Sequence, residues 1–133
     1  MKNEINKPVI IIGGAGHGCV IEACIKDNRN RYNDLEWDIV GYCNDFDKEV
    51  DGYPVLGKLA DIPRLLEEGY YFAWAVHLIG RNVKTAQMFE ALNIPDEKWA
   101  TIIHHTAFID STVFLIINNF ICNNKPIYSS NIF

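Results

Sequence analysis

Apolar residues are arranged in alternating blocks along the chain, and the first block is the clearest. Four branched apolar residues, Val9-Ile10-Ile11-Ile12, follow one another without a polar position, which predicts a strand buried on both faces. Glycines come next, and apolar residues then recur at helical spacing, so we expect a helix over about residues 16–26. The pattern therefore predicts a strand, a glycine-rich turn and a helix in immediate succession.

The same alternation continues through most of the remaining chain. The polar, irregular segment 27–38 is expected to be a surface loop, and segment 46–57, which contains Asp51-Gly52 and Pro54, a turn-rich connector. Strands alternating with helices favour a Rossmann-like α/β fold, in which a parallel sheet is flanked by helices. The further strands are expected over 37–43, 71–76 and 99–103, and the further helices over 60–68 and about 82–92.

Near the C-terminus the apolar residues stand six positions apart, a period that neither a helix nor an ordinary strand has. A left-handed parallel β-helix has this period, because each side of its triangular coil takes six residues and points one aliphatic side chain inward. An irregular apolar tail is the alternative. We expect a Rossmann-like domain over residues 1–104 and an incomplete hexapeptide-repeat β-helix over 105–133. The positions are Ile103, Ile109, Leu115, Ile121, Ile127 and Phe133.

The glycine-rich turn after the first strand is the strongest candidate for a ligand site. Gly14 and Gly16 let the backbone approach a phosphate, and the N-terminus of the following helix offers N–H groups and a positive dipole. The strict dinucleotide pattern fails at Cys19, where glycine or alanine is expected, which disfavours NAD and FAD. The working hypothesis is that the turn holds the diphosphate of a nucleotide or a nucleotide-sugar.

Two further loops are expected at the same edge of the sheet, because ligands of parallel sheets bind beyond the carboxyl ends of the strands. Asn44 and Asp45 follow the second strand, and residues 77–82 follow the third. The Asp45 carboxylate could bond a ribose or a base, or merely order its loop. Arg81 could attract an anion or simply be solvated. No metal site is expected, because the His104-His105 pair has no third ligand in view.

Composition and charge narrow the possible functions. The chain has 133 residues, a formal net charge of −5 and no basic stripe, which disfavours a nucleic-acid partner. No apolar run reaches the ~20 residues of a membrane span, and the N-terminus lacks a secretion signal, so we expect a cytoplasmic protein without a membrane partner. The cysteines form no C-x-x-C pair and are expected to be buried, reduced thiols.

Four stretches, taken in this order, resemble one bacterial family. They are KPVIIIGGAGHG, a second strand ending in Asn44-Asp45, DGYPVLGKLADI, and IHHTAFIDSTV at the entry to hexapeptide repeats. Over about residues 7–115 the chain resembles the PglD/NeuD-type sugar acetyltransferases, which include bacillosamine, perosamine and sialic acid acetyltransferases of glycan biosynthesis. The resemblance implies an N-terminal Rossmann-like domain that binds a UDP-sugar. It also implies a C-terminal left-handed β-helix that binds acetyl-CoA, carries a catalytic histidine and forms homotrimers.

The resemblance also implies the roles of individual residues. The glycine-rich turn would contact the phosphates and the sugar, the end of the second strand would lie near the nucleoside, and the third loop would complete the site. The family's catalytic histidine belongs to a later coil, so no catalytic residue is expected here, and neither His104 nor His105 is given that role. Acetyl-CoA is expected as the co-substrate of full-length relatives, with no site for it in this chain and no tightly bound cofactor. The expected substrate-binding residues are Gly14, Ala15, Gly16, His17, Asn44, Asp45, Gly80 and Arg81, with His77 as the alternative to Gly80.

Taken together, these features predict the nucleotide-sugar-binding portion of an acetyl-CoA-dependent sugar N- or O-acetyltransferase, acting on a UDP-amino-sugar or a sialic acid-like sugar. The 133-residue chain by itself is expected to bind a UDP-sugar without acetylating it. One alternative is a stand-alone module that binds a nucleotide-sugar without catalysis. The other is a small NAD-binding Rossmann protein, against which Cys19 and the lack of a Tyr-x-x-x-Lys pair argue.

Overall fold

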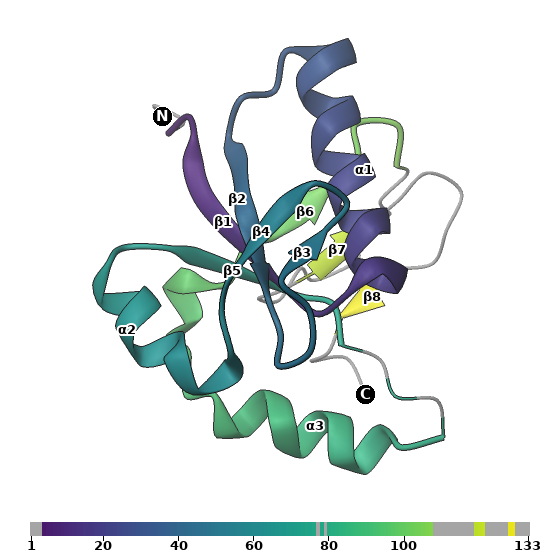
Figure 1. The fold of residues 1–133 in the computed structure, drawn as a ribbon. Helices are drawn as coiled ribbons and strands as arrows, with labels where there is room; N and C mark the ends of the chain where they lie inside the picture. Colours follow the sequence, from purple (N-terminus) through teal and green to yellow (C-terminus); the bar gives the residue numbers. More distant parts are fainter. Residues whose placement is uncertain (1–3, 77, 79, 108–118, 122–127, 130–133) are drawn as a thin grey trace.

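A mostly parallel five-stranded sheet forms the centre of the computed structural model, which describes residues 4–76, 78, 80–107, 119–121 and 128–129 (Figure 1). Its strands are β1 (Lys7–Ile12), β2 (Trp37–Cys43), β3 (Glu49–Val50), β4 (Tyr53–Gly57) and β5 (Tyr71–Trp74), in the spatial order β3-β4-β2-β1-β5. β1 pairs in parallel with β2 and β5, β2 pairs in parallel with β4, and β3 is antiparallel to β4. The predicted α/β fold with a parallel sheet is confirmed.

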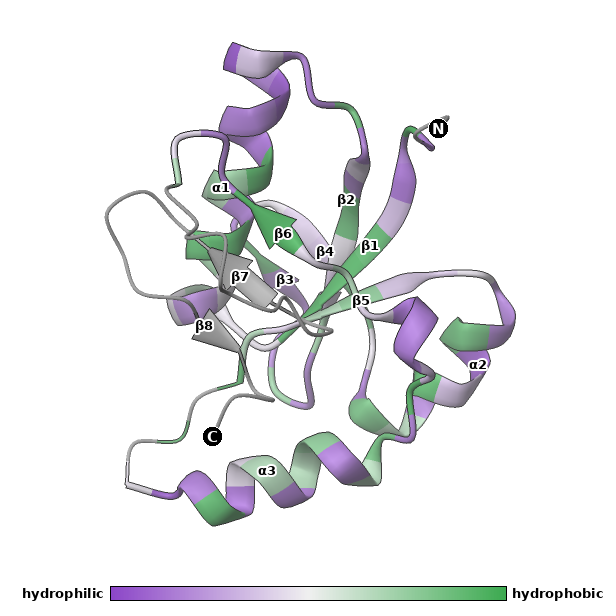
Figure 2. Ribbon diagram, turned by 180° about the vertical axis from the view of Figure 1, so that it is seen from behind, coloured by the Kyte–Doolittle hydropathy of each residue, from purple (hydrophilic) through white to green (hydrophobic). Residues whose placement is uncertain are grey.

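Helices cover both faces of this sheet. α1 (Ala15–Tyr32) packs on one face, whereas α2 (Ile62–Glu67) and α3 (Asn82–Ala91) pack on the other. The short turns η1 (Leu59–Asp61) and η2 (Asp96–Lys98) precede α2 and follow α3. Figure 2 shows an apolar centre of the sheet and hydrophilic turns of α1 near its C-terminal end. Within the part of the chain that the structure describes, no helix is long and apolar enough to cross a bilayer.

Alternation along β1 lets one strand pack against both helical layers. Its last four side chains are all 0% exposed, and alternate ones point to opposite faces. Burial of each such side chain contributes about 1.5–3 kcal/mol, so β1 is a major part of both layers. The predicted strand with two buried faces is confirmed. Val9 and Ile11 pack with Ile21, Cys24 and Ile25 of α1, and Ile10 and Ile12 pack with Ile62 and Leu65 of α2.

α1 continues through a segment for which the sequence predicted a surface loop. The predicted helix of residues 16–26 extends to Tyr32, so the expectation of a loop from residue 27 is wrong. The polar residues of the added turns have partners: Arg31 donates two 2.8 Å hydrogen bonds to Asp27, and Asn28 is buried. Asn33, in the left-handed conformation with φ of 52°, ends the helix.

The predicted connector over residues 46–57 is also wrong, because this segment forms a β-hairpin. Asp51 and Gly52 join β3 to β4, and their φ angles of 49° and 84° suit a two-residue hairpin turn. β4 then pairs in parallel with β2. Gly41 permits this close pairing, since a Cβ there would lie 2.5 Å from the carbonyl oxygen of Pro54.

The other predicted elements agree with the structure more closely, except toward the C-terminus. β2 matches its predicted range, and α3 ends one residue early. Of the predicted strand over 99–103, Trp99 forms only an isolated bridge with Phe72, while β6 (Ile102–Ile103) belongs to a second sheet. Tertiary pairing thus divides that segment between two sheets.

The second sheet contains β6, β7 (Asn119–Ile121) and β8 (Tyr128–Ser129). β7 is parallel to β6 and antiparallel to β8. Among the described residues no β-helix is seen, and several of the positions with six-residue spacing, including Ile109, Leu115 and Phe133, lie outside those residues. The hexapeptide-repeat domain therefore stays a prediction.

Substitution of Gly41 tests the close pairing of β4 with β2. The added methyl group of Gly41→Ala would overlap the Pro54 carbonyl oxygen, so the free energy of unfolding in urea should fall by about 1–3 kcal/mol. Gly16→Ala is the control, because a Cβ at Gly16 meets nothing within 4 Å. It should leave stability unchanged or raise it by up to about 1 kcal/mol. Equal stabilities of the two variants would contradict the proposed constraint at Gly41.

Candidate functional site

Three loops meet at one edge of the sheet. β1, β2 and β5 are mutually parallel, so their carboxyl ends lie at the same edge, as Figure 1 shows. The glycine-rich turn, the segment after Cys43 and the segment before α3 leave from these ends. Ligands of parallel sheets bind at such an edge, and every residue predicted to bind substrate belongs to one of these three loops.

Gly13 fixes the glycine-rich turn between its two neighbouring strands. Its N–H donates a 3.0 Å hydrogen bond to the carbonyl of Cys43, and its φ is 140°. A Cβ at this position would lie 2.8 Å from the carbonyl oxygen of Ala75. Only glycine therefore fits, because any side chain would meet both an unfavourable backbone conformation and a backbone atom.

The first turn of α1 faces outward at this edge. Gly14 is the N-cap and provides no side-chain hydrogen bond, and no acidic residue lies in the first turn. Ala15, Gly16 and His17 are exposed, and a Cβ at Gly14 would have only Asp47 Oδ2 nearby, at 3.8 Å. The N–H groups of a first helical turn have no intrahelical partners, and the dipole makes this end positive. The turn thus has the geometry of an anion-binding site.

Asn44 and Asp45 hold the loop after β2 in place. Asn44 Nδ2 donates to the Gly13 carbonyl at 3.0 Å, and Asn44 Oδ1 accepts the N–H groups of Phe46 and Asp47 at 2.9 and 2.7 Å. Asp45 Oδ1 accepts the N–H of Leu59 at 3.0 Å. Both side chains therefore order the loop next to the glycine-rich turn. Whether they also contact a nucleoside stays a prediction.

The third loop brings Gly80 and Arg81 to the start of α3. Gly80 has a φ of 72°, which favours glycine, and the Arg81 N–H donates to the Leu78 carbonyl at 3.0 Å. Arg81 is the N-cap residue of α3 and is exposed. His77 lies outside the described residues. A role for Gly80 and Arg81 in binding stays a prediction.

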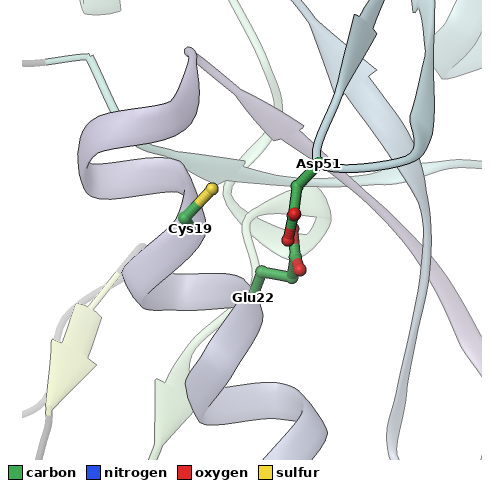
Figure 3. A group of neighbouring side chains, drawn as sticks. All are labelled: Cys19, Glu22 and Asp51. Carbon is green, nitrogen blue, oxygen red and sulfur yellow. The ribbon is translucent and has the colours of Figure 1, made fainter.

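A cluster of ionisable groups that sequence reasoning missed lies between α1 and the β3–β4 turn (Figure 3). The sulfur of Cys19 and carboxylate oxygens of Glu22 and Asp51 lie within 4.8 Å of one another. Glu22 is 3% exposed, and its two oxygens accept hydrogen bonds from Tyr42 Oη at 2.7 Å and Lys26 Nζ at 2.8 Å. The i,i+4 spacing of Glu22 and Lys26 was a visible signal for part of this cluster, but Asp51 comes from a distant turn.

Glu22 and Asp51 share a hydrogen bond, which changes the pKa of both carboxyl groups. Burial favours a higher pKa for Glu22, but the hydrogen bonds from Lys26 and Tyr42 outweigh it and leave that pKa below its ordinary value. The hydrogen bond with Glu22 and the repulsion from its charge raise the pKa of Asp51. A like charge close by disfavours ionisation of a carboxyl group, so the position of Asp51 next to Glu22 favours the protonated form of Asp51.

The C-terminal half of α1 binds the segment that follows β6, through contacts here called the α1 clasp (Asp27, Asn28, His104 and His105). Buried Asn28 donates to the Ile103 carbonyl at 2.9 Å and accepts the His105 N–H at 3.1 Å. His105 also stacks on Tyr32, with ring centroids 4.8 Å apart. A cavity of about 310 Å³ lies beside the clasp and is lined in part by Asn28, His104 and His105. The clasp therefore fixes where the chain leaves the sheet.

His104 is held by hydrogen bonds at both ring nitrogens. Nδ1 lies 2.6 Å from Thr106 Oγ1 and 3.2 Å from the Thr106 backbone N, and Nε2 lies 2.6 Å from Asp27 Oδ2. Hydrogen bonds from Arg31 and His104 lower the pKa of Asp27 to about 2. His104 is 7% exposed. The geometry describes a histidine that ties a loop to a helix.

Comparison with known proteins agrees with the resemblance found in the sequence. The PglD N-terminal domain family matches residues 8–92. The fold is similar to the acetyltransferase domain of PglB from Neisseria gonorrhoeae in complex with acetyl coenzyme A, with 25% identity and a TM-score of 0.55, covering 77% of this chain and 46% of that one. A mutant perosamine N-acetyltransferase from Caulobacter crescentus, in complex with CoA and GDP-perosamine, gives 23% identity and a TM-score of 0.57, covering 78% and 46%. The chain thus spans less than half the length of these proteins. No curated protein matches it.

Asp51→Asn tests the raised pKa of Asp51 next to Glu22. A raised pKa stabilises the fold below the unfolded value of about 3.9, and this stabilisation is lost as the pH rises through the folded pKa. The amide of the variant needs no proton, so wild-type stability should fall relative to Asp51→Asn as the pH rises above about 4 in urea unfolding. In a Glu22→Gln background this difference should disappear. A stability difference that is constant with pH would exclude the raised pKa.

Asn28→Ala tests the α1 clasp. Loss of two buried hydrogen bonds should lower the free energy of unfolding by about 1–3 kcal/mol and speed hydrogen exchange at the His105 amide. Asn30→Ala, on the exposed side of the same helix, is the matched control and should change stability by less than about 0.5 kcal/mol. Unchanged exchange at His105 in Asn28→Ala would show that Asn28 does not hold this segment.

Proposed function

Because the chain belongs to the PglD N-terminal domain family of sugar acetyltransferases, we propose that it binds the nucleotide-sugar substrate of such an enzyme at the carboxyl edge of its sheet. The observation that carries the proposal is the uncapped, outward-facing first turn of α1 next to a turn that only glycine can form. A diphosphate carries the charge that this helix end attracts and the oxygen acceptors that its N–H groups need.

The remaining site residues receive roles from their positions around that diphosphate. Asp45 uses one carboxylate oxygen for Leu59, and its other oxygen accepts a hydrogen bond from the ribose or the base. His17, exposed on the first turn, contacts the phosphates or the sugar. The exposed guanidinium of Arg81 attracts the diphosphate from the third loop. A UDP-sugar is the proposed ligand, since Cys19 breaks the pattern expected for NAD.

The proposal places acetyl transfer outside residues 8–92, in the part of the relatives that lies beyond the matched domain. The perosamine enzyme holds CoA together with GDP-perosamine, and the PglB domain holds acetyl coenzyme A. A general base in that second part removes a proton from the sugar amine or hydroxyl, which then attacks the thioester carbonyl; the C–S bond breaks, and CoA leaves as the thiol after taking up the proton. The proposed division is a Rossmann-like domain over residues 1–104 and hexapeptide repeats from residue 105, with the sugar bound by the first and acetyl-CoA by the second.

α1 supports this division because its two ends lie at the two regions concerned. Its N-terminus is at the proposed diphosphate site, and its C-terminal half forms the clasp with residues 103–105. A helix of 18 residues is about 27 Å long. One rigid element thus connects the bound nucleotide-sugar with the start of the segment that leads to the second domain.

A charge reversal at Gly16 tests the proposed diphosphate site. Because a Cβ at Gly16 meets nothing within 4 Å, Gly16→Glu should fold, and a carboxylate there even suits the helix dipole. Its charge would repel the diphosphate and weaken UDP-N-acetylglucosamine binding by at least about tenfold in isothermal titration calorimetry. Gly16→Gln has the same size without the charge and should bind more tightly than Gly16→Glu. Equal affinities of wild type and Gly16→Glu, or tighter binding of NAD than of the UDP-sugar, would refute the proposal.

A further inference from the structure

Phe46 is an aromatic residue in an unusual place. Its side chain is 92% exposed, which is more than that of any other large apolar residue among those described. It stands directly after Asn44 and Asp45 in the loop that follows β2. Transfer of a phenylalanine ring out of water lowers the free energy of the protein. An exposed ring therefore lacks a stabilisation that buried phenylalanines provide.

Hydrogen bonds order the backbone of the loop from which the exposed Phe46 ring projects. The Phe46 N–H is hydrogen-bonded to Asn44 Oδ1 at 2.9 Å, and the same oxygen accepts the Asp47 N–H at 2.7 Å. Asn44 is in turn bonded to the Gly13 carbonyl, and the neighbouring Asp45 to the Leu59 N–H. These bonds fix the chain on both sides of Phe46 and direct the residue outward.

The same bonds place this loop beside the proposed diphosphate site. Asn44 Nδ2, in this loop, donates a 3.0 Å hydrogen bond to the Gly13 carbonyl. Asp47 Oδ2 lies 3.8 Å from the position that a Cβ would take at Gly14, the N-cap of α1. A nucleotide with its phosphates on the first turn of α1 extends its nucleoside toward the end of the second strand in folds of this architecture. The base then reaches the surface on which Phe46 stands.

We infer that the Phe46 ring stacks on the nucleobase of the nucleoside diphosphate, an inference that rests on the proposed function. Stacking needs only a flat aromatic face, so it strengthens binding without selecting one base. The exposed carboxylate of Asp45 next to it accepts hydrogen bonds from polar edges of the nucleoside. Phe46 thus stacks on the face of the base, and Asp45 accepts a hydrogen bond from the edge of the base or from the ribose.

Two exposed valines do not offer this contact, and the exposed aromatic Tyr32 already stacks on His105 at the other end of α1. Val83 on α3 is 73% exposed and Val20 on α1 is 48% exposed, but both are aliphatic and have no ring to stack. Val83 is nevertheless useful, because it lies near the start of α3 at the third loop. Its truncation removes exposed apolar surface from the same edge of the sheet without touching an aromatic ring.

Titrations with UDP and with inorganic pyrophosphate separate the base contact from the phosphate contact. Phe46→Ala should weaken UDP binding by about tenfold to hundredfold and leave pyrophosphate binding unchanged. Phe46→Tyr keeps the ring and should stay within threefold of wild type, as should Val83→Ala. In proton NMR spectra, the uracil H5 and H6 signals of bound UDP should move upfield with wild type and much less with Phe46→Ala.

The possible failures are distinguishable. If wild type binds UDP and Phe46→Ala binds it within twofold as tightly, stacking by Phe46 is refuted while the proposed function stands. If Phe46→Ala instead changes the molecular mass in solution, the ring is covered by a second copy of the chain and the inference is wrong. If wild type binds pyrophosphate and UDP equally, no base contact exists. If wild type binds neither, the proposed function fails as well.

Discussion

The backbone of Gly13 lies between two neighbouring strands, and the geometry of the whole carboxyl edge depends on that position. Its N–H is bonded to the end of β2, and the place of a side chain is taken by the carbonyl of Ala75 just beyond β5. The chain can therefore turn from β1 into α1 only here and only with glycine. This turn sets the direction of the α1 N-terminus, and Asn44 ties the loop after β2 to the same residue. Gly13 thus places the N-terminus of α1 next to the loop that carries Asp45 and Phe46.

α1 is the second element on which the structure depends, because residues along its length contact three other parts of the molecule. Gly18 allows the Tyr42 ring to pack against it, since a Cβ there would lie 2.7 Å from Tyr42 Cε2. Glu22 lies next to Asp51 of the β3–β4 turn, and Asn28 is hydrogen-bonded to the segment after β6. A rigid helix with these attachments can hold the phosphate end of a ligand at a fixed place relative to the start of the following segment.

Sequence patterns predicted the parts of the fold that follow from local periodicity. The apolar run at residues 9–12, the glycines after it and the apolar spacing in α1 and α3 were sufficient for those elements. The added turns of α1 were missed because Asn28 finds its partners at Ile103 and His105, far away in the chain. The β3–β4 hairpin was missed although Asp51-Gly52 is a hairpin signal, because Pro54 and the glycines around it suggested a connector. At the site, exposure of the first turn of α1 followed from the motif, whereas the hydrogen bonds of Asn44 and Asp45 to Gly13 and Leu59 depend on tertiary structure.

The central claim, that the first turn of α1 binds the diphosphate of a nucleotide-sugar, is tested most directly by two-dimensional NMR of the ¹⁵N-labelled protein during titration with UDP-N-acetylglucosamine. The account predicts that the backbone amide signals of Ala15, Gly16 and His17 shift together and saturate with one affinity. Signals that shift only around the cavity beside the α1 clasp, at Asn28, Trp37 and His105, while the first turn of α1 is unaffected, would contradict it.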